Sequence, residues 1–196
     1  MKLASALICA SGLCVTPFPW PDALIIACLI VLNGVFAMSE LAIVSAKPAR
    51  LKGKRDKGSA GAKVALQLAA DPGKFLSTVQ IGITLVGIIA GAYSGASLGG
   101  PVGERMLALG VPPEWAADIG FALVIALTTY FSLVVGELVP KQLALRHAVP
   151  IAVAMSRPMA LVARIAAPLV WVLDTSSGLL IRLLGVRPGG QTSVTA

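Results

Sequence analysis

The sequence has little charge and almost no histidine for its length. Charged residues make up 13% of the 196 residues, against about 25% in an ordinary soluble domain. Hydrophobic residues make up 57%, and the mean hydropathy is +0.87. His147 is the only histidine in the sequence, which argues against a zinc enzyme. The composition therefore excludes an ordinary soluble domain and favours a chain whose apolar surface meets lipid.

Cysteine is scarce as well. The spacing of Cys9, Cys14 and Cys28 fits neither a metal-binding motif nor a disulfide framework. Cys28 lies inside an apolar run, so we expect it to be a small buried hydrophobe. The sequence also has no nucleophile–base pair and no Gly-rich phosphate loop. We therefore predict no enzymatic activity and no catalytic cofactor.

The positive charge gathers beside apolar segments. The net charge is +7, and six basic residues lie between Lys47 and Lys57, directly after an apolar run. Basic residues beside a span mark its cytoplasmic side, so we interpret this cluster as a topology signal and not as a nucleic-acid surface. Of sixteen basic residues, only Lys2 and Arg105 then face outward. This predicts a multi-pass protein of the inner (plasma) membrane with its N-terminus outside and its C-terminus in the cytoplasm.

Three apolar runs reach the roughly 20 residues that a bilayer-spanning helix needs. They predict spans at about 23–45, 75–98 and 115–140. A Gly- and Pro-rich segment at 99–113 has no positive excess, so we expect it to be an outer loop. The predicted fold class is an all-α membrane protein with three transmembrane helices plus juxtamembrane or interfacial amphipathic helices.

Two further segments predict helices at the membrane surface. Residues 59–70 form an amphipathic stretch suited to the interface. Residues 142–186 are apolar but interrupted by charges and by Pro150, Pro158 and Pro168. For this second stretch we expect proline-broken interfacial helices rather than a fourth crossing.

The two ends of the chain lie outside the predicted membrane domain, residues 23–186. Residues 1–22 resemble a signal-peptide core without a clear cleavage site, or a disordered lead-in. Asp22 is a candidate cap for the first span. Residues 187–196 predict a disordered tail.

Two acidic residues lie toward the ends of apolar runs. They are Glu40 in the first span and Glu137 in the third. A carboxylate at membrane depth is costly unless it pairs, faces water or serves a transported species, so it is a functional-site hypothesis by default. Two such acids on two spans indicate a cation path.

Small and polar residues follow one face of the second span. They recur at steps of three and four: Ser77, Gln80, Thr84, Gly87, Gly91 and Ser94. For the glycines, close helix packing explains the spacing. Gln80 and Thr84 carry more hydrogen-bonding capacity than packing needs, so a role in ion binding stands beside packing.

A proline near the end of the third span disturbs the backbone beside Glu137. Pro140 has no N–H, so the carbonyl of Gly136 loses its helical partner. Thr129 and Ser132 share a face with this turn. Carboxylate, carbonyl and hydroxyl oxygens are hard ligands that suit Mg²⁺ or Na⁺. The alternative is a proline-terminated helix whose glutamate reaches the cytoplasmic surface.

On the first span, Asn33 lies seven residues before Glu40 and so faces the same way. Asn33 is a candidate ion-site residue, and a hydrogen bond between packed helices is the alternative role for its amide.

Three motifs in order along the chain resemble the CNNM/CorC family, whose bacterial members are often labelled hemolysin-C-related. They are FAMSELAIVSA with Ser39, Glu40 and Ser45, FLSTVQIGITLVGI from Phe75 to Ile88, and GELVPKQLAL from Gly136 to Leu145. The resemblance covers about residues 24–185. Nothing in the sequence supports reading the hemolysin label as pore-forming toxicity.

The resemblance implies a homodimeric domain of three transmembrane helices in the lipid bilayer, with Mg²⁺ efflux exchanged for Na⁺. Mg²⁺ is then a transported substrate. Matching the family's ion-site segments are Ser39, Glu40, Ser77, Gly136, Glu137 and Pro140. Among these, Ser39, Ser77, Gly136 and Glu137 are the candidate metal ligands.

The sequence departs from the family pattern in ligands and in length. Many members have serine where Ala37 stands and asparagines where Ile83 and Thr84 stand, which leaves fewer ligands for Mg²⁺. The IGIT version resembles a subgroup for which polyamines are also candidate substrates. Members usually continue into a CBS pair, which binds adenine nucleotide, and a CorC/HlyC-type domain. This chain ends before them, so we expect a truncated product, a domain fragment or a lone membrane module, and the resemblance does not carry ATP control over to it.

The leading hypothesis is a Mg²⁺ transporter domain that works by alternating access. One alternative is export of a polyamine or another organic cation, with Glu40 and Glu137 pairing its ammonium groups. The other is a non-transporting membrane anchor or regulatory module, in which the acids serve only helix packing.

Overall fold

The computed structural model describes residues 16–183, and every regular element in that range is helical. In chain order these are α1 (Trp20–Ser45), α2 (Pro48–Asp56), α3 (Ala60–Ala70), α4 (Pro72–Ala108), α5 (Pro113–Leu133), the π-helical segment η2 (Val134–Leu138), α6 (Val139–Arg146) and α7 (Ala148–Leu183). The all-α prediction is confirmed for this part of the chain. Most of the predicted lead-in (residues 1–15) and the predicted tail (187–196) lie outside the described residues.

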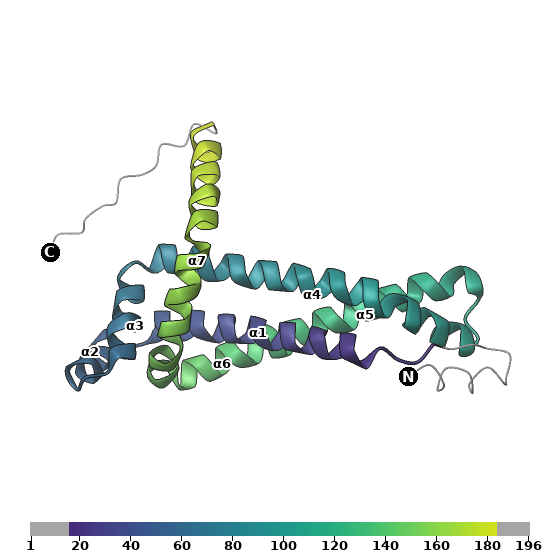
Figure 1. Ribbon diagram of the computed structural model, residues 1–196, viewed down its shortest axis with the longest axis horizontal. Coiled ribbons are helices and arrows are strands. Elements are labelled where there is room, and N and C mark those ends of the chain that lie inside the picture. The colour runs from purple at the N-terminus through teal and green to yellow at the C-terminus, as the bar shows by residue number, and fades with distance from the viewer. Residues whose placement is uncertain (1–15, 184–196) are drawn as a thin grey trace.

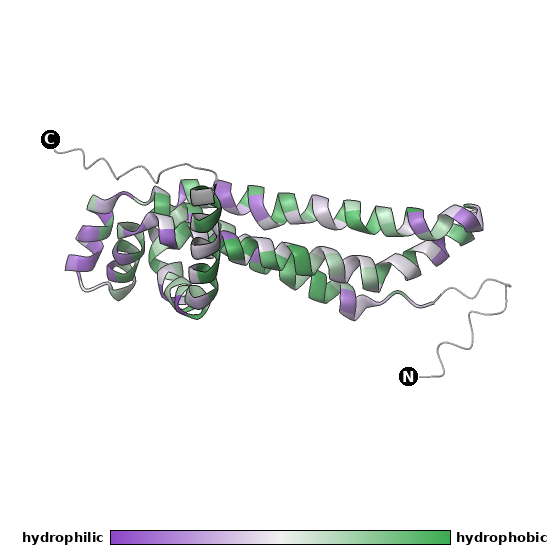
Figure 2. Cartoon of the chain, turned by 90° about the horizontal axis from the view of Figure 1, so that it is seen from above, coloured by the Kyte–Doolittle hydropathy of each residue, from purple (hydrophilic) through white to green (hydrophobic). Residues whose placement is uncertain are grey.

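Three long helices lie side by side and form the body of the molecule (Figure 1). They are α1, α4, and α5 continued without a break through η2 into α6. Hydrophobic residues dominate along these helices, whereas hydrophilic residues gather at the end that carries α2 (Figure 2). Leu24, Ile88 and Phe121 are among many large apolar side chains that point outward from the bundle. The chain is a multi-pass membrane protein whose apolar exterior suits lipid.

Glycines let the long helices approach closely. A Cβ on Gly120 of α5 would lie 2.5 Å from the backbone nitrogen of Gly103 in α4. A Cβ on Gly34 of α1 would lie 3.0 Å from the Cγ of Pro140 and 3.1 Å from the carbonyl oxygen of Val135. In lipid the hydrophobic effect does not drive helices together, and close packing at small residues stabilises their association instead. These glycines therefore fix how α1, α4 and α5 fit together.

The structure has four candidate spans, whereas three spans were predicted. Four helices in the described range are long and apolar enough to cross a membrane, and the fourth is Ala148–Ile181. The predicted proline-broken interfacial helices are instead one continuous helix, α7, with Pro158 and Pro168 inside it. Each proline removes only one backbone hydrogen bond, and the apolar surroundings keep the helix intact on both sides.

The direction of α7 differs from that of the other three long helices. In Figure 1 α7 runs across α1 and α4, and it contacts both helices. Buried side chains of α7, including Ala152 and Met159, join a core that contains Ile43 of α1, Leu51 of α2 and Phe75 of α4. The core of the molecule thus lies at the end of the bundle where α2, α3 and α7 meet.

Several predicted boundaries also change. The segment predicted as an outer loop, 99–113, is helical as far as Ala108, with Pro101 inside α4. The prediction failed because Gly99 and Gly103 serve helix packing against α5 and not a turn. The third span continues as a helix to Arg146, past the predicted end at residue 140.

Two predictions for single residues of α1 are also wrong. The N-cap of α1 is Pro19, with no side-chain cap. Asp22 instead accepts a hydrogen bond of 2.6 Å from the Tyr93 hydroxyl of α4. Cys28 is exposed on the outside of the bundle, because it lies on the α1 face away from the neighbouring helices.

Candidate functional site

A cavity of about 240 Å³ opens among α1, α4 and α5. Its polar lining consists of Asn33, Thr128, Thr129, Ser132 and Glu137, and its remaining lining is Ile83, Gly87, Gly91 and Leu133. This volume has room for several water molecules. Two segments far apart in the sequence, α1 and the α5–η2 helix, thus place oxygen-bearing side chains around one space whose α4 side is apolar. We call this space the cation cavity below.

Asn33 is the most constrained polar residue of this cavity. Its side chain is buried, with 7% of the residue exposed, and its Nδ2 donates a hydrogen bond of 3.3 Å to the carbonyl oxygen of Gly136. Its Oδ1 is the one buried side-chain nitrogen or oxygen without a hydrogen-bond partner in residues 16–183. Leaving a buried acceptor unpaired costs roughly 1–3 kcal/mol. The Asn33 oxygen is therefore suited to a donor or a cation that enters the cavity.

The backbone beside this asparagine departs from the α-helix. Val139 donates its N–H to the carbonyl oxygen of Val134, five residues back, so η2 is a π-helical turn between α5 and α6. The sequence predicted that Pro140 deprives the Gly136 carbonyl of its helical partner. In the structure this carbonyl accepts a hydrogen bond from Asn33. Gly136 itself is needed there, because a Cβ would lie 3.2 Å from the carbonyl oxygen of Ile30. Single π turns of this kind are frequent at functional sites.

Glu137 forms an ion pair on its own helix. Lys141 Nζ lies 2.6 Å from Glu137 Oε1, and each side chain is about one-third exposed (34% for Lys141 and 35% for Glu137). Glu40 of α1 is half-buried and does not line the cation cavity. The structure thus places one of the two predicted acids, Glu137, at this cavity.

The other predicted site residues lie elsewhere. Ser39 is fully buried and donates its hydroxyl to the carbonyl of Val35, one turn back in α1. Ser77 is half-buried, while Gln80 and Thr84 are exposed, and none of the three lines the cation cavity. From the predicted polar face of α4, only Gly87 and Gly91 reach it.

The predicted metal ligands are not gathered in the cation cavity. Of Ser39, Ser77, Gly136 and Glu137, only Glu137 lines it. In the part of the chain that the structure describes, no three His, Cys, Asp or Glu residues are grouped so that they could hold a metal ion. Their role as metal ligands stays a prediction.

Two residues of the site were missed from the sequence. Thr128 is almost completely buried and lines the cation cavity, and its place directly before Thr129 was the available signal. Lys141 was taken only as a topology marker. Its spacing of four residues from Glu137 is the classical signal for a helical ion pair.

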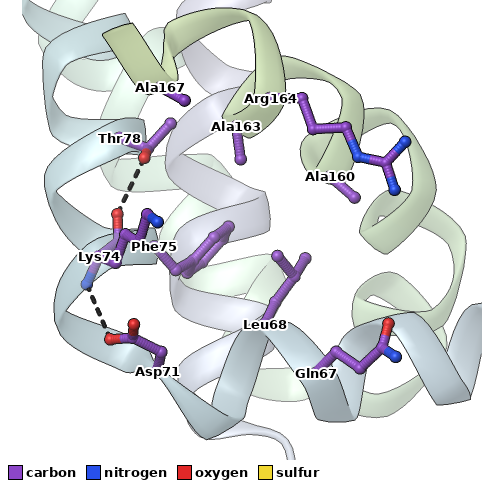
Figure 3. Close-up of a pocket in the computed structure, with 10 residues that line it drawn as sticks. All are labelled: Gln67, Leu68, Asp71, Lys74, Phe75, Thr78, Ala160, Ala163, Arg164 and Ala167. Carbon is purple, nitrogen blue, oxygen red and sulfur yellow. Dashed lines mark hydrogen bonds between the residues drawn. The ribbon is translucent and has the colours of Figure 1, made fainter. Parts of the chain in front are cut away.

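A second cavity, of about 310 Å³, lies where α3 and the start of α4 meet α7. Figure 3 shows Leu68 and Phe75 pointing into its middle, while Arg164 extends away from them. The polar groups near its edge serve the start of α4, since Asp71 Oδ1 accepts from the backbone of Lys74 at 3.3 Å. Apolar side chains occupy the middle of this cavity, and its polar groups do not point toward one another. It is therefore a weaker candidate for a binding site than the cation cavity.

Comparison with known proteins agrees with the resemblance in the three motifs. A family model described as the Cyclin M transmembrane N-terminal domain (CNNM) matches residues 24–196. A UPF0053 protein of Synechocystis is 44% identical over 167 residues, which is 85% of this chain and 37% of the relative. The UPF0053 protein YhdT of Bacillus subtilis is 34% identical over 176 residues, 87% of this chain and 37% of the relative.

A third relative is named for an activity. The polyamine export protein of Escherichia coli is 27% identical over 173 residues, which is 88% of this chain and 38% of that protein. The chain thus spans less than half the length of these three relatives. The match over nearly the whole chain confirms the family, and the chain belongs to the CNNM transmembrane-domain family, with UPF0053 proteins among its relatives.

Proposed function

We propose that this chain is the membrane-spanning part of a cation transporter and that the cation passes through the cation cavity. The observation that carries the proposal is the unpaired Oδ1 of buried Asn33 at a cavity that also holds the Glu137 carboxylate. A buried acceptor and a carboxylate among apolar helices are costly to keep. A positively charged substrate that binds both groups would offset this cost.

The charges near the cavity support the same proposal. Glu137 lines the cation cavity and already binds the Lys141 ammonium group at 2.6 Å. A cation that enters the cavity would compete with Lys141 for this carboxylate.

The crosswise path of α7 supports a particular topology. In this proposal α1, α4 and the α5–η2–α6 helix cross the membrane of the cell, and α7 lies in the cytoplasmic interface. A helix that runs across three spanning helices lies near the plane of the membrane. Exposed Ile165 and Val172 on one face of α7 suit the acyl region, and exposed Arg157 and Arg164 on a neighbouring face suit headgroups.

Two cations fit the cavity chemically. Mg²⁺, exchanged for Na⁺, is favoured by a lining whose polar groups are mostly neutral oxygens, with one carboxylate. Mg²⁺ usually keeps several waters and binds through one or two carboxylates, and a cavity of about 240 Å³ has room for such waters. An alkylammonium substrate is favoured by the Glu137–Lys141 pair, in which this carboxylate already binds an ammonium group at 2.6 Å. The names of the polyamine export relatives support the second substrate.

Flux into proteoliposomes tests the proposal and separates the two substrates. The purified chain is reconstituted, and the uptake of Mg²⁺ and of butane-1,4-diamine is measured separately, with and without a Na⁺ gradient. We expect Glu137→Gln to reduce the flux of the true substrate at least tenfold. The control Glu114→Gln makes the same change at an exposed position in the first turn of α5 and should leave flux unchanged.

Each outcome of the flux assay has a clear reading. Flux of Mg²⁺ alone selects the metal, and flux of diamine alone selects the organic cation. If Glu137→Gln transports normally, the cation cavity is not the transport path. If neither cation moves, the remaining alternative holds, and the chain is a membrane anchor or regulatory module.

A further inference from the structure

We propose that α2 and the junction between α6 and α7 form a binding site for a phosphate-bearing anion. The site is a basic cleft defined by Lys47, Arg50, Lys54, Lys57, Arg146 and His147. It lies at the end of the molecule opposite the connection between α4 and α5 (Figure 1). Along the chain, α2 follows α1 directly. It is separate from the cation cavity, so this inference does not depend on the transport proposal.

The first observation is the arrangement of charge on α2. Of the six basic residues from Lys47 to Lys57, four are spaced by three, four and three residues: Lys47, Arg50, Lys54 and Lys57. Arg50 and Lys54 share one face of α2, and Lys47 and Lys57, the residues that flank the helix, line the same two hollows as they do. Lys52 and Arg55 lie on other faces, and Arg55 is already paired with Asp56 at 2.8 Å. The orientation of α2 is fixed, because Leu51 is fully buried in the core.

The second observation is that the four basic residues face two hollows that adjoin each other. One hollow, of about 340 Å³, is lined by Lys47, Arg50, Arg146 and His147, with Pro150. The other, of about 450 Å³, is lined by Arg50, Lys54 and Lys57, again with Pro150. Since Arg50, Val149 and Pro150 belong to both, the two hollows form one continuous cleft.

The third observation is the absence of a counter-charge. No carboxylate lines either hollow. Among the side chains that the structure describes, which leave out Asp174 and Arg182, the ion pairs are Arg55–Asp56 and Glu137–Lys141, and neither includes a residue of the basic cleft. Five formal positive charges therefore converge, with a histidine, on a concave surface that supplies no anion of its own.

The positive-inside rule does not account for this arrangement. That rule concerns the number of Lys and Arg residues near a span and not the face they occupy. It would be satisfied equally if Lys52 and Arg55 faced the cleft or if Arg146 lay elsewhere. The fold instead brings Arg146 and His147, about 90 residues further along the chain, against the charged face of α2.

The chemistry of the cleft points to phosphate. Arginine presents a planar donor fork that matches phosphate oxygens, and lysine adds compact charge. Clusters of four to eight basic residues directly beside a span are typical of binding sites for anionic lipid headgroups. A soluble polyphosphate offers the same chemistry, so the experiment has one arm for each source.

Two double variants with the same change of charge test the proposal. Arg50→Gln/Lys54→Gln removes two charges from the basic cleft, and Lys52→Gln/Arg55→Gln removes two from the other faces of α2. For the lipid arm, phosphatidylglycerol bound to the intact chain is counted by native mass spectrometry from micelles that also contain phosphatidylcholine. For the soluble arm, pyrophosphate is titrated calorimetrically into the chain in phosphatidylcholine nanodiscs.

We expect the cleft variant to lose about tenfold or more in affinity, since each basic contact to a headgroup contributes measurably. The control variant should bind as the unchanged chain does, and circular dichroism should show equal helicity for both. Arg146→Gln, on a different helix, should weaken binding in the same arm. Binding in either arm supports the site and names its source. Equal loss in both double variants, or no binding in either arm, would overturn the proposal.

Discussion

Replacement of Gly120 by alanine tests the packing of α4 against α5. An added Cβ would lie 2.5 Å from the backbone nitrogen and 2.6 Å from the Cα of Gly103. Both atoms belong to the backbone, so no side chain can rotate away. Opening the 2.5 Å contact to an ordinary contact of 3.4 Å requires the two helices to separate locally by about 0.9 Å.

The expected cost follows from that separation. Overpacking a tight interior costs roughly 1–3 kcal/mol, and alanine in place of glycine returns up to about 1 kcal/mol through helix propensity. We therefore expect Gly120→Ala to lower the free energy of unfolding by about 1–2 kcal/mol. The measurement is equilibrium unfolding of the purified chain in mixed micelles, followed by circular dichroism.

Gly100→Ala is the matched control for this prediction. Gly100 lies on α4, and a Cβ there meets nothing within 4 Å. The control should be as stable as the unchanged chain or slightly more stable. If both variants lose the same stability, or if Gly120→Ala loses none, α4 and α5 do not pack as described.

Three further predictions concern single hydrogen bonds. Asn33→Ala removes both the amide that donates to Gly136 and the unpaired acceptor. Cation flux into proteoliposomes should therefore fall at least tenfold at unchanged helicity, and normal flux would show that Asn33 is not part of the site. Tyr93→Phe removes the 2.6 Å bond to Asp22 and should cost about 0.5–1.5 kcal/mol in micelle unfolding, whereas an unchanged midpoint would mean that this bond adds nothing. Ser156→Ala removes the hydroxyl that donates to the carbonyl of Gly61 at 2.8 Å. Limited proteolysis should then cut the α3 region faster, and equal cleavage rates would show that this hydrogen bond does not hold α3 against α7.

The sequence predicted the parts of the fold that depend on composition and spacing. Apolar runs located the three long helices, because only a continuous helix satisfies the backbone in lipid. The path of α7 was not predictable in this way. Pro158 and Pro168 normally argue for a break, and the contacts of α7 with the core, Ala152 and Met159 among them, are visible only in the structure. Likewise, Gly99 and Gly103 predict a loop in the sequence, and their packing against Gly120 of α5 is visible only in the structure.

For the candidate site, the sequence predicted the chemistry better than the geometry. Glu137 and Asn33 were found because a carboxylate and an amide in apolar runs are costly. Gln80 and Thr84 were favoured by the same reasoning, yet they are exposed and do not line the cation cavity. A helical face is visible in the sequence, but the neighbour that this face meets depends on packing between segments far apart in the chain.

The features discussed above lie in order along one helix of 34 residues, Pro113–Arg146. Gly120 packs against α4, Thr128 lines the cation cavity, Glu137 meets Lys141, and Arg146 reaches the basic cleft. If a cation passes through the cavity as we propose, a bend of this helix at the π turn η2 would open it. The Gly136 carbonyl in η2 loses its α-helical partner at Pro140 and accepts a hydrogen bond from Asn33 of α1. A bend there would break the Asn33 contact and move Glu137 relative to α1, so the proposed binding residues would also control release.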